Sequence, residues 1–419
     1  MSPTDTSPNA EEGLLRELDE AKPVRRRRRR RRRRPAPKAN WFWRFLFPLV
    51  VVGLGYATFE LWREGTKAVL DSTDGTLIEV VSDPNAPGFE AFVSSTPTMI
   101  VLHTDDTDRL VGVTVLARTL LDNGGQGVLL SADLAADGLG GATLADRYAA
   151  EGASAVERDV GTLFGFGFSE TLTLATADLG PLLALVEPLQ FALLDDLVNV
   201  TGDGTAEIWL EAGGKQLDGE TAAEVYAFRN PDEPDVNRNE RQLDLWESWL
   251  LSISQADDLD AAALPFDEGL SAYLKAFAVG QRDLQLAPAR PADPNEAQPV
   301  YVFDDAGRAW LADVAERMTP LPIAPIGSDL PSVRLLDGTG DRRIAQEALD
   351  VVVRLSEVEI FGNATEFGLS QTTVSYHDPA GADAAADLAS SLGGLAQFDP
   401  RPDDPVDLTV VIGTDWEAP

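Results

Sequence analysis

The chain has no cysteine and only two histidines among its 419 residues. The absence of cysteine excludes disulfides, thiol nucleophiles and thiolate metal sites. His103 and His377 lie far apart in the sequence, and neither has the surroundings of a Ser-His-Asp nucleophile. We therefore expect satisfied or exposed histidines, no resident metal and no cofactor.

Positive charge is scarce beyond the first 40 residues. The chain has 34 Lys and Arg against 69 Asp and Glu, and residues 1–40 hold 13 and 6 of these. Residues 41–419 therefore carry 21 basic and 63 acidic side chains, a formal net charge of −42. Because such a surface repels polyanions at long range, we expect no nucleic-acid partner.

An apolar run follows ten consecutive arginines, Arg25–Arg34. Phe45–Phe59 carries no charge, and with aromatic flanks from Trp41 to Trp62 the run makes about 33 Å of helix, enough to cross a bilayer. Positive charge stays on the cytoplasmic side. The sequence thus predicts a disordered basic cytoplasmic tail over 1–40, a single transmembrane helix over 41–63, and a cell-membrane protein whose bulk is extracytoplasmic.

Two alternatives remain open for this end of the chain. A basic segment followed by an apolar core is also the pattern of a cleaved signal peptide, although a leader of this length is unusual. The arginine tract is suited to nucleic acid or anionic lipid as well as to fixing topology. We favour the anchor and the topology signal.

The outer part divides by composition into an α/β domain, a connector and a small terminal domain. Over residues 76–280, strand-like runs such as Thr98–Thr104 alternate with helical ones such as Thr143–Gly165, which predicts a layered α/β(α) domain. Residues 281–331 are rich in Pro and Ala and predict a connector with a short helical piece. Residues 332–419 read βαββαβ, the order of a ferredoxin-like domain.

Four spaced motifs mark the terminal domain. They are VRLLDGTG (Val333–Gly340), FGNAT (Phe361–Thr365), TTVSYHDPAG (Thr372–Gly381) and DLTVVIGTDW (Asp407–Trp416). In this order they resemble the C-terminal domain of LytR-CpsA-Psr (LCP) family proteins, which attach glycopolymers to the bacterial cell wall. Asp337 stands where the family usually has Asn before the Gly-Thr-Gly turn. The motif residues we single out are Asp337, Gly338, Gly340, Asn363, Tyr376, Asp415 and Trp416; turn geometry and core packing are favoured over ligand contact for the glycines, Asn363 and Trp416.

The first outer domain resembles the family's catalytic domain more distantly, through Leu217–Gln242. In active relatives this region supplies arginines that hold the pyrophosphate of a polyprenyl-linked donor, and guanidinium groups suit that purpose because they bind phosphate oxygens bidentately. The resemblance assigns this place to Arg229, Arg238, Arg241, Asp235 and Gln242. An ion-paired helix surface, with Asp232, Glu233, Asp235 and Glu240 as partners, is the alternative for the three arginines.

The rest of the catalytic pattern is mostly missing. Ala132 replaces the arginine of the family's Pro-Arg-Asp motif and Asp133 keeps its acid, whereas the metal-holding Asp falls near Pro97. Arg147 is a partial substitute for a lost basic residue. The nearby acidic turn at residues 105–108 is expected to be a solvated loop.

The resemblance and its gaps predict a non-catalytic binder anchored in the envelope. Its expected ligand is a polyprenyl-linked lipid precursor, a wall glycopolymer or an active LCP-family protein. The alternative is an active Mg²⁺-dependent phosphotransferase that moves glycopolymers from polyprenyl diphosphate to peptidoglycan, with Arg147, Asp133 and Arg229 as compensating residues. That alternative requires three arginines to converge on one apolar pocket.

Overall fold

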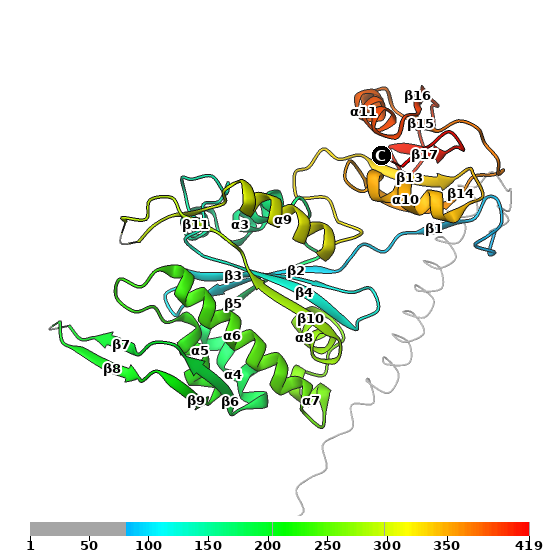
Figure 1. The fold of residues 1–419 in the computed structure, drawn as a ribbon. Helices are drawn as coiled ribbons and strands as arrows, with labels where there is room; N and C mark the ends of the chain where they lie inside the picture. The colour runs from blue at the N-terminus through cyan, green and yellow to red at the C-terminus, as the bar shows by residue number, and fades with distance from the viewer. Residues whose placement is uncertain (1–80, 203, 297, 419) are drawn as a thin grey trace, which may run out of the picture. The chain divides into compact units, whose positions relative to one another are not determined.

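The computed structural model describes residues 81–202, 204–296 and 298–418 (Figure 1). The basic tail expected over 1–40 and the membrane span expected over 41–63 lie outside these residues. Within the described residues, every helix is too short or too polar to cross a bilayer. Residues 80–419 form one compact unit.

The elements of this unit are as follows. The strands are β1 (Glu90–Phe92), β2 (Thr98–Thr104), β3 (Leu110–Arg118), β4 (Gly124–Leu130), β5 (Glu170–Ala175), β6 (Leu189–Leu193), β7 (Leu197–Val200), β8 (Ala206–Leu210), β9 (Gly213–Leu217), β10 (Gln281–Leu286), β11 (Arg290–Pro291), β12 (Tyr301–Val302), β13 (Ser332–Asp337), β14 (Glu357–Asn363), β15 (Thr373–Tyr376), β16 (Leu395–Phe398) and β17 (Leu408–Ile412). The helices are α2 (Leu144–Glu151), α3 (Ala153–Phe164), α4 (Thr176–Leu183), η1 (Ala184–Val186), α5 (Gly219–Ala227), α6 (Asp235–Ser254), α7 (Leu259–Ala263), α8 (Gly269–Val279), α9 (Asp305–Met318), α10 (Arg342–Val352), η2 (Pro379–Gly381) and α11 (Ala382–Leu392).

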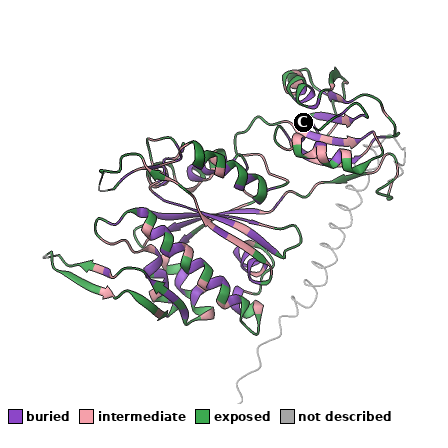
Figure 2. Ribbon diagram, viewed as in Figure 1, coloured by how far each residue is buried: buried purple, intermediate pink, exposed green. Residues whose placement is uncertain are grey.

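The first domain is built on a five-stranded mixed sheet in the order β10-β4-β3-β2-β5. β2, β3 and β4 are antiparallel neighbours, whereas β5 and β10 join the two edges in parallel. Every residue of β2 is buried, because helices cover both faces of the sheet (Figure 2). A strand buried on both faces favours a continuous apolar run over an alternating pattern. The layered α/β(α) architecture predicted from the sequence is confirmed for this domain.

Two hydrophobic cores lie on opposite faces of that sheet (Figure 1). One is formed with α4, α5, α6 and α8, and it holds Tyr226, Trp246, Trp249, Tyr273 and Phe277. The other is formed with α2, α3 and α9 and is mainly aliphatic, with Phe164, Phe166, Tyr301 and Phe303. The face with α6 therefore contains the larger aromatic side chains.

Residues 281–331 are only partly a connector, which corrects the sequence expectation. β10 pairs in parallel with β4 from Gln281 to Leu286, so it is an edge strand of the first sheet. α9 packs Leu311, Val314 and Met318 into the aliphatic core. α9 is the short helical piece that the sequence predicted, whereas β10 was not predicted. The helix expected over Thr143–Gly165 is two helices, because the chain passes through Gly152 at φ 81° between α2 and α3.

The terminal domain is α/β, but it is not ferredoxin-like. Its sheet has the order β1-β14-β13-β17-β15-β16, with β13 parallel to both β14 and β17. Each helix joins parallel neighbours, α10 between β13 and β14 and α11 between β15 and β16. A ferredoxin-like sheet needs each helix to cross over an intervening strand. β16, which was not predicted, follows α11 and pairs with β15 at the edge of the sheet. β17 lies between β13 and β15.

Candidate functional site

The arginine segment of the first domain runs from the end of α5 into the first turns of α6. Asn230 and Glu233 close a turn, with the Glu233 N–H donating to the Asn230 carbonyl at 3.1 Å. Pro234 precedes the helix and Asp235 opens it, where a carboxylate is favoured by the helix dipole. Because α6 begins directly after Pro234, Arg238 and Arg241 lie on one helix.

All three arginines of this segment are paired with carboxylates. Arg229 Nη1 lies 2.9 Å from Asp133 Oδ2, at the end of β4. Arg238 forms an ion pair with Asp235, and Arg241 forms one with Glu233. The cluster of these six side chains, which we call the ion-pair cluster, therefore has three positive and three negative charges.

Two of the partners named by the ion-paired alternative, Glu233 and Asp235, pair with these arginines. Most of the ion-pair cluster is buried rather than on the helix surface. Asp235 is fully buried, and Arg238 and Arg241 are each 6% exposed. Arg241 Nη2 also donates to the Phe228 carbonyl at 2.7 Å. The hydroxyl of Ser131 donates to Asp235. Burial of this kind favours paired charges, and it leaves little guanidinium surface for a diphosphate.

Asp133 is the most exposed acid of the ion-pair cluster. Burial and the neighbouring Asp235 raise its pKa, while Arg229 and Arg238 act in the opposite direction. Its side chain is 23% exposed. The arginine position of the family motif, Ala132, is 1% exposed and belongs to the aliphatic core on the other face of the sheet.

The remaining sequence candidates of this region do not complete a catalytic site. Gln242 Nε2 donates to the carbonyls of Val111 (3.0 Å) and Tyr226 (3.2 Å), so the amide serves the fold. Arg147 lies on α2, where its Nε donates to Asp159 at 2.7 Å, and no contact links it to the ion-pair cluster. Among the described residues, no group of acidic and histidine side chains is arranged to hold a metal.

The core beside the ion-pair cluster is filled. His103, Tyr226, Trp246 and Trp249 line a cavity of only about 10 Å³. His103 contacts Tyr226 with ring centroids 4.5 Å apart, and burial lowers its pKa to about 3. A polyprenyl tail needs an apolar cavity of hundreds of Å³. None of the three arginines lines this cavity.

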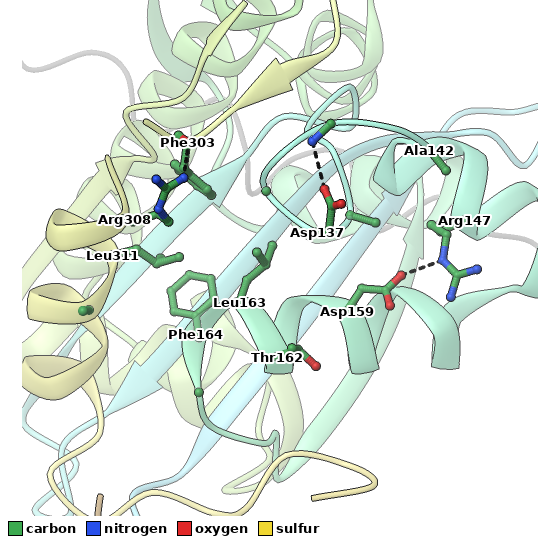
Figure 3. Close-up of a pocket in the computed structure, with 15 residues that line it drawn as sticks. Asp137, Ala142, Arg147, Asp159, Thr162, Leu163, Phe164, Phe303, Arg308 and Leu311 are labelled. Atoms are coloured by element: carbon green, nitrogen blue, oxygen red, sulfur yellow. Dashed lines mark hydrogen bonds and ion pairs between the residues drawn. The ribbon is translucent and has the colours of Figure 1, made fainter. Parts of the chain in front are cut away.

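A pocket of about 700 Å³ lies on the opposite face, between the loop over residues 136–142, α3 and α9 (Figure 3). Leu163, Phe164, Phe303 and Leu311 give it an apolar lining. Its charged side chains are two basic ones, Arg147 and Arg308, and two acidic ones, Asp137 and Asp159. Sequence reasoning missed this pocket, because its residues come from two segments more than 130 positions apart and only Arg147 had been singled out.

The polar groups of this pocket are held in place by local bonds. Asp137 accepts backbone N–H groups of Leu139 (2.8 Å) and Gly140 (2.9 Å), and these bonds lower its pKa. Arg308 Nη1 donates to the Phe303 carbonyl at 2.8 Å. Asp137 is therefore a fixed, charged acceptor at the rim, and Arg308 a fixed donor.

The motif residues of the terminal domain have structural contacts. Asp337 Oδ1 accepts from Thr339 N (2.8 Å) and Gly340 N (3.1 Å), and Gly340 has φ 82°. Asp415 accepts both the N–H and the hydroxyl of Thr372 at 2.8 Å, Tyr376 contacts Phe398, and Trp416 is buried in the core. A Cβ on Gly338 would lie 2.7 Å from the Ile412 carbonyl oxygen.

This terminal region matches a known family. Residues 331–416 match the family described as LytR cell envelope-related transcriptional attenuator. The terminal domain is a LytR C-terminal domain. The resemblance drawn from its four motifs is confirmed, although the LytR C-terminal domain here contains an additional strand, β1, from outside the matched residues.

Several solved structures are similar to about half of this chain. TagV of B. subtilis is 15% identical, covers 54% of this chain and 98% of its own, and has a TM-score of 0.41. TagT with bound octaprenyl pyrophosphate lipid is 12% identical, with coverage of 57% and 93% and a TM-score of 0.40. A LytR-Csp2A-Psr enzyme from Actinomyces oris is 17% identical, with coverage of 56% and 96% and a TM-score of 0.40. No curated protein matches the sequence.

Proposed function

We propose that this chain is a membrane-anchored, extracytoplasmic cell-envelope protein that binds a wall glycopolymer and does not transfer it. The observation that carries the non-catalytic part is the ion-pair cluster. Transfer from a diphosphate carrier needs unpaired positive charge where phosphate charge develops. Arg229, Arg238 and Arg241 instead each face a carboxylate of the same chain.

The filled aromatic core argues against the lipid-linked precursor as ligand. A cavity of about 10 Å³ beside the arginines admits no prenyl unit. The Mg²⁺-dependent phosphotransferase required three arginines around one apolar pocket, and Arg147 is bonded to Asp159 on the other face of the sheet. We therefore favour binding over catalysis.

The pocket of Figure 3 is the binding site in this proposal. Its volume of about 700 Å³ suits one or a few sugar units. Sugars combine hydroxyl groups, which bond to carboxylates and guanidinium groups, with C–H faces that contact apolar side chains. The balanced charges of the pocket, two basic and two acidic, and the net charge of −42 over residues 41–419 favour a neutral glycan over a polyanionic one.

The proposal is tested on the full chain in detergent micelles. One assay follows binding and cleavage of a polyprenyl diphosphate lipid with Mg²⁺. A second follows binding of neutral wall oligosaccharides and of their phosphorylated counterparts by calorimetry. We expect no cleavage, and tighter binding of the neutral oligosaccharides. Cleavage of the diphosphate would overturn the non-catalytic assignment, and preference for the phosphorylated set would overturn the neutral-glycan assignment.

A matched pair of variants locates the site. Leu163→Trp places a bulky ring in the pocket and should weaken oligosaccharide binding at least tenfold. Leu251→Trp makes the same exchange on α6, where Leu251 is 48% exposed, and should leave binding unchanged. Equal affinities for both variants would place the binding site elsewhere.

A further inference from the structure

The segment Asp83–Val93 lies along one edge of the LytR C-terminal domain. β1 pairs antiparallel with β14, with Ala91 opposite Phe361 (Figure 1). Backbone bonds continue on both sides of the three paired positions. Gly88 N donates to Ala364 O at 2.9 Å, and Val93 N donates to Glu359 O at 2.9 Å. The edge strand of the terminal domain therefore comes from more than 260 residues earlier in the chain.

Asn363 holds the start of this segment with its side chain. Its Nδ2 donates to the carbonyl oxygens of Pro84 (3.0 Å) and Ala86 (2.8 Å), and its backbone N–H donates to Phe89 O at 2.7 Å. The side-chain amide of Asn363 thus donates both of its hydrogens to backbone carbonyls that lie outside the family match at residues 331–416. The Asn of the FGNAT motif acts as a clamp for an incoming extended backbone.

Gly362 leaves the space that this backbone needs. A Cβ at Gly362 would lie 2.1 Å from Phe89 O and 2.9 Å from Glu90 Cα. Any side chain would therefore push the segment off the edge. The two residues act on the same segment: Gly362 leaves room for its backbone, and Asn363 forms hydrogen bonds to it.

The side chains of β1 contribute little to this pairing. All three residues of β1 are exposed, and Phe92 is 81% exposed. The one ion pair of β1 joins Glu90 to Arg334 Nε at 3.3 Å. Since the bonds are mainly to backbone, the edge recognises an extended main chain, as strand-addition sites do.

We propose that residues 361–364 form a strand-docking site whose occupant is Asp83–Val93 of the same chain. The domain is then discontinuous, made of residues 83–93 and 331–416, with the α/β domain inserted between them. The terminal domain is held to the stretch that follows the predicted membrane span, so it works close to the bilayer. Only this last location rests on the proposed function, since the docking itself does not require an anchor.

An engineered disulfide tests which chain supplies the strand. The protein has no cysteine, so Ala91→Cys with Phe361→Cys introduces a single pair at directly opposed positions, within the separation a disulfide spans. The control pair is Ala91→Cys with Gln397→Cys, on the opposite edge strand β16. We expect oxidation of the full chain in detergent to give an intrachain cross-link for the first pair and none for the control. A covalent dimer would mean that a second copy supplies the strand, and no cross-link would mean that the site is empty; either result overturns the proposal.

A glycine pair tests the mechanism. Gly362→Ala should speed amide hydrogen exchange at Gly88 and Val93 at least tenfold, because docking is sterically blocked. Gly381→Ala is the control in the same domain, since its Cβ would meet nothing closer than 3.4 Å. Unchanged protection in Gly362→Ala would contradict the docking geometry. If Gly362→Ala unfolds the domain, the disulfide experiment still tests the docking, because both of its cysteine pairs retain Gly362. Oligosaccharide binding at the pocket of the first domain tests the proposed function separately.

Discussion

The Arg229 guanidinium lies 2.9 Å from the Asp133 carboxylate and links the loop between α5 and α6 to the segment after β4. The resemblance drawn from the sequence identified Arg229 as a candidate for phosphate binding and Asp133 as a supporting residue. Here they neutralise each other, with Asp235 a further 3.9 Å contact of Arg229.

This relationship predicts strong energetic coupling between the two side chains. Arg229→Met and Asp133→Asn should each destabilise the protein, and the double variant should be more stable than the sum of the two effects by about 1 to 2 kcal/mol. Urea denaturation of the four proteins measures this. The exposed pair Arg343 and Glu347 is the control, with an expected coupling of about 0.5 kcal/mol or less. Additive effects at Arg229 and Asp133 would show that their pairing does not stabilise the fold.

His103 predicts acid sensitivity. Burial lowers its pKa from 6.5 to about 3, so the folded state keeps it neutral while the unfolded chain takes up a proton below pH 6.5. Its contribution to stability is complete above pH 6.5 and is lost as the pH falls toward 3. Between pH 7 and pH 5 the loss is about 2 kcal/mol. Denaturation at both pH values should show this difference in wild type and a smaller one in His103→Gln; identical pH dependence would refute the assignment.

The aromatic core beside the ion-pair cluster predicts a large cost for truncation. Trp249 is 2% exposed, and Trp249→Ala should cost about 3 to 5 kcal/mol because a cavity replaces the indole. Leu251→Ala, on the same helix but half exposed, should change stability by about 0.5 kcal/mol or less. Thermal unfolding of both variants provides the comparison. A mild effect at Trp249 would indicate that the core is loosely filled and open to a lipid.

Asp337 predicts a difference between two substitutions. Asp337→Asn restores the residue usual in the family and keeps an oxygen that accepts from Thr339 and Gly340, so stability should change little. Asp337→Ala removes these bonds from a side chain that is 3% exposed and should cost about 1 to 3 kcal/mol. Urea denaturation of both variants measures the difference. If the role of Asp337 depended on its charge, the asparagine variant would be as unstable as the alanine variant.

The elements that the sequence predicted well are those with strong local patterns. β2 was predicted at its observed bounds because its apolar run ends at turn formers. β10 has a largely polar sequence and pairs with β4, more than 150 residues earlier, while β16 has only four residues. The terminal sheet was given the wrong strand order although its main helices and strands were identified.

The candidate site was predictable to a similar extent. The pairing of Arg238 with Asp235 follows from a spacing of three residues on one helix. The pairing of Arg229 with Asp133 does not, because their separation in sequence is 96 positions. Nor does the sequence indicate that the arginines are buried, since this depends on the aromatic side chains that fill the space beneath them.

The pairing of β1 with β14 also sets an order of events during synthesis. Residues 83–93 leave the ribosome long before Phe361–Ala364 exist, so this strand must wait while the inserted domain is made and folded. Its docking closes the largest loop of the described chain, and closing a loop of that size is slow relative to local folding. Prematurely terminated chains would lack the receiving edge, and the docked strand thus distinguishes a finished polypeptide from an incomplete one.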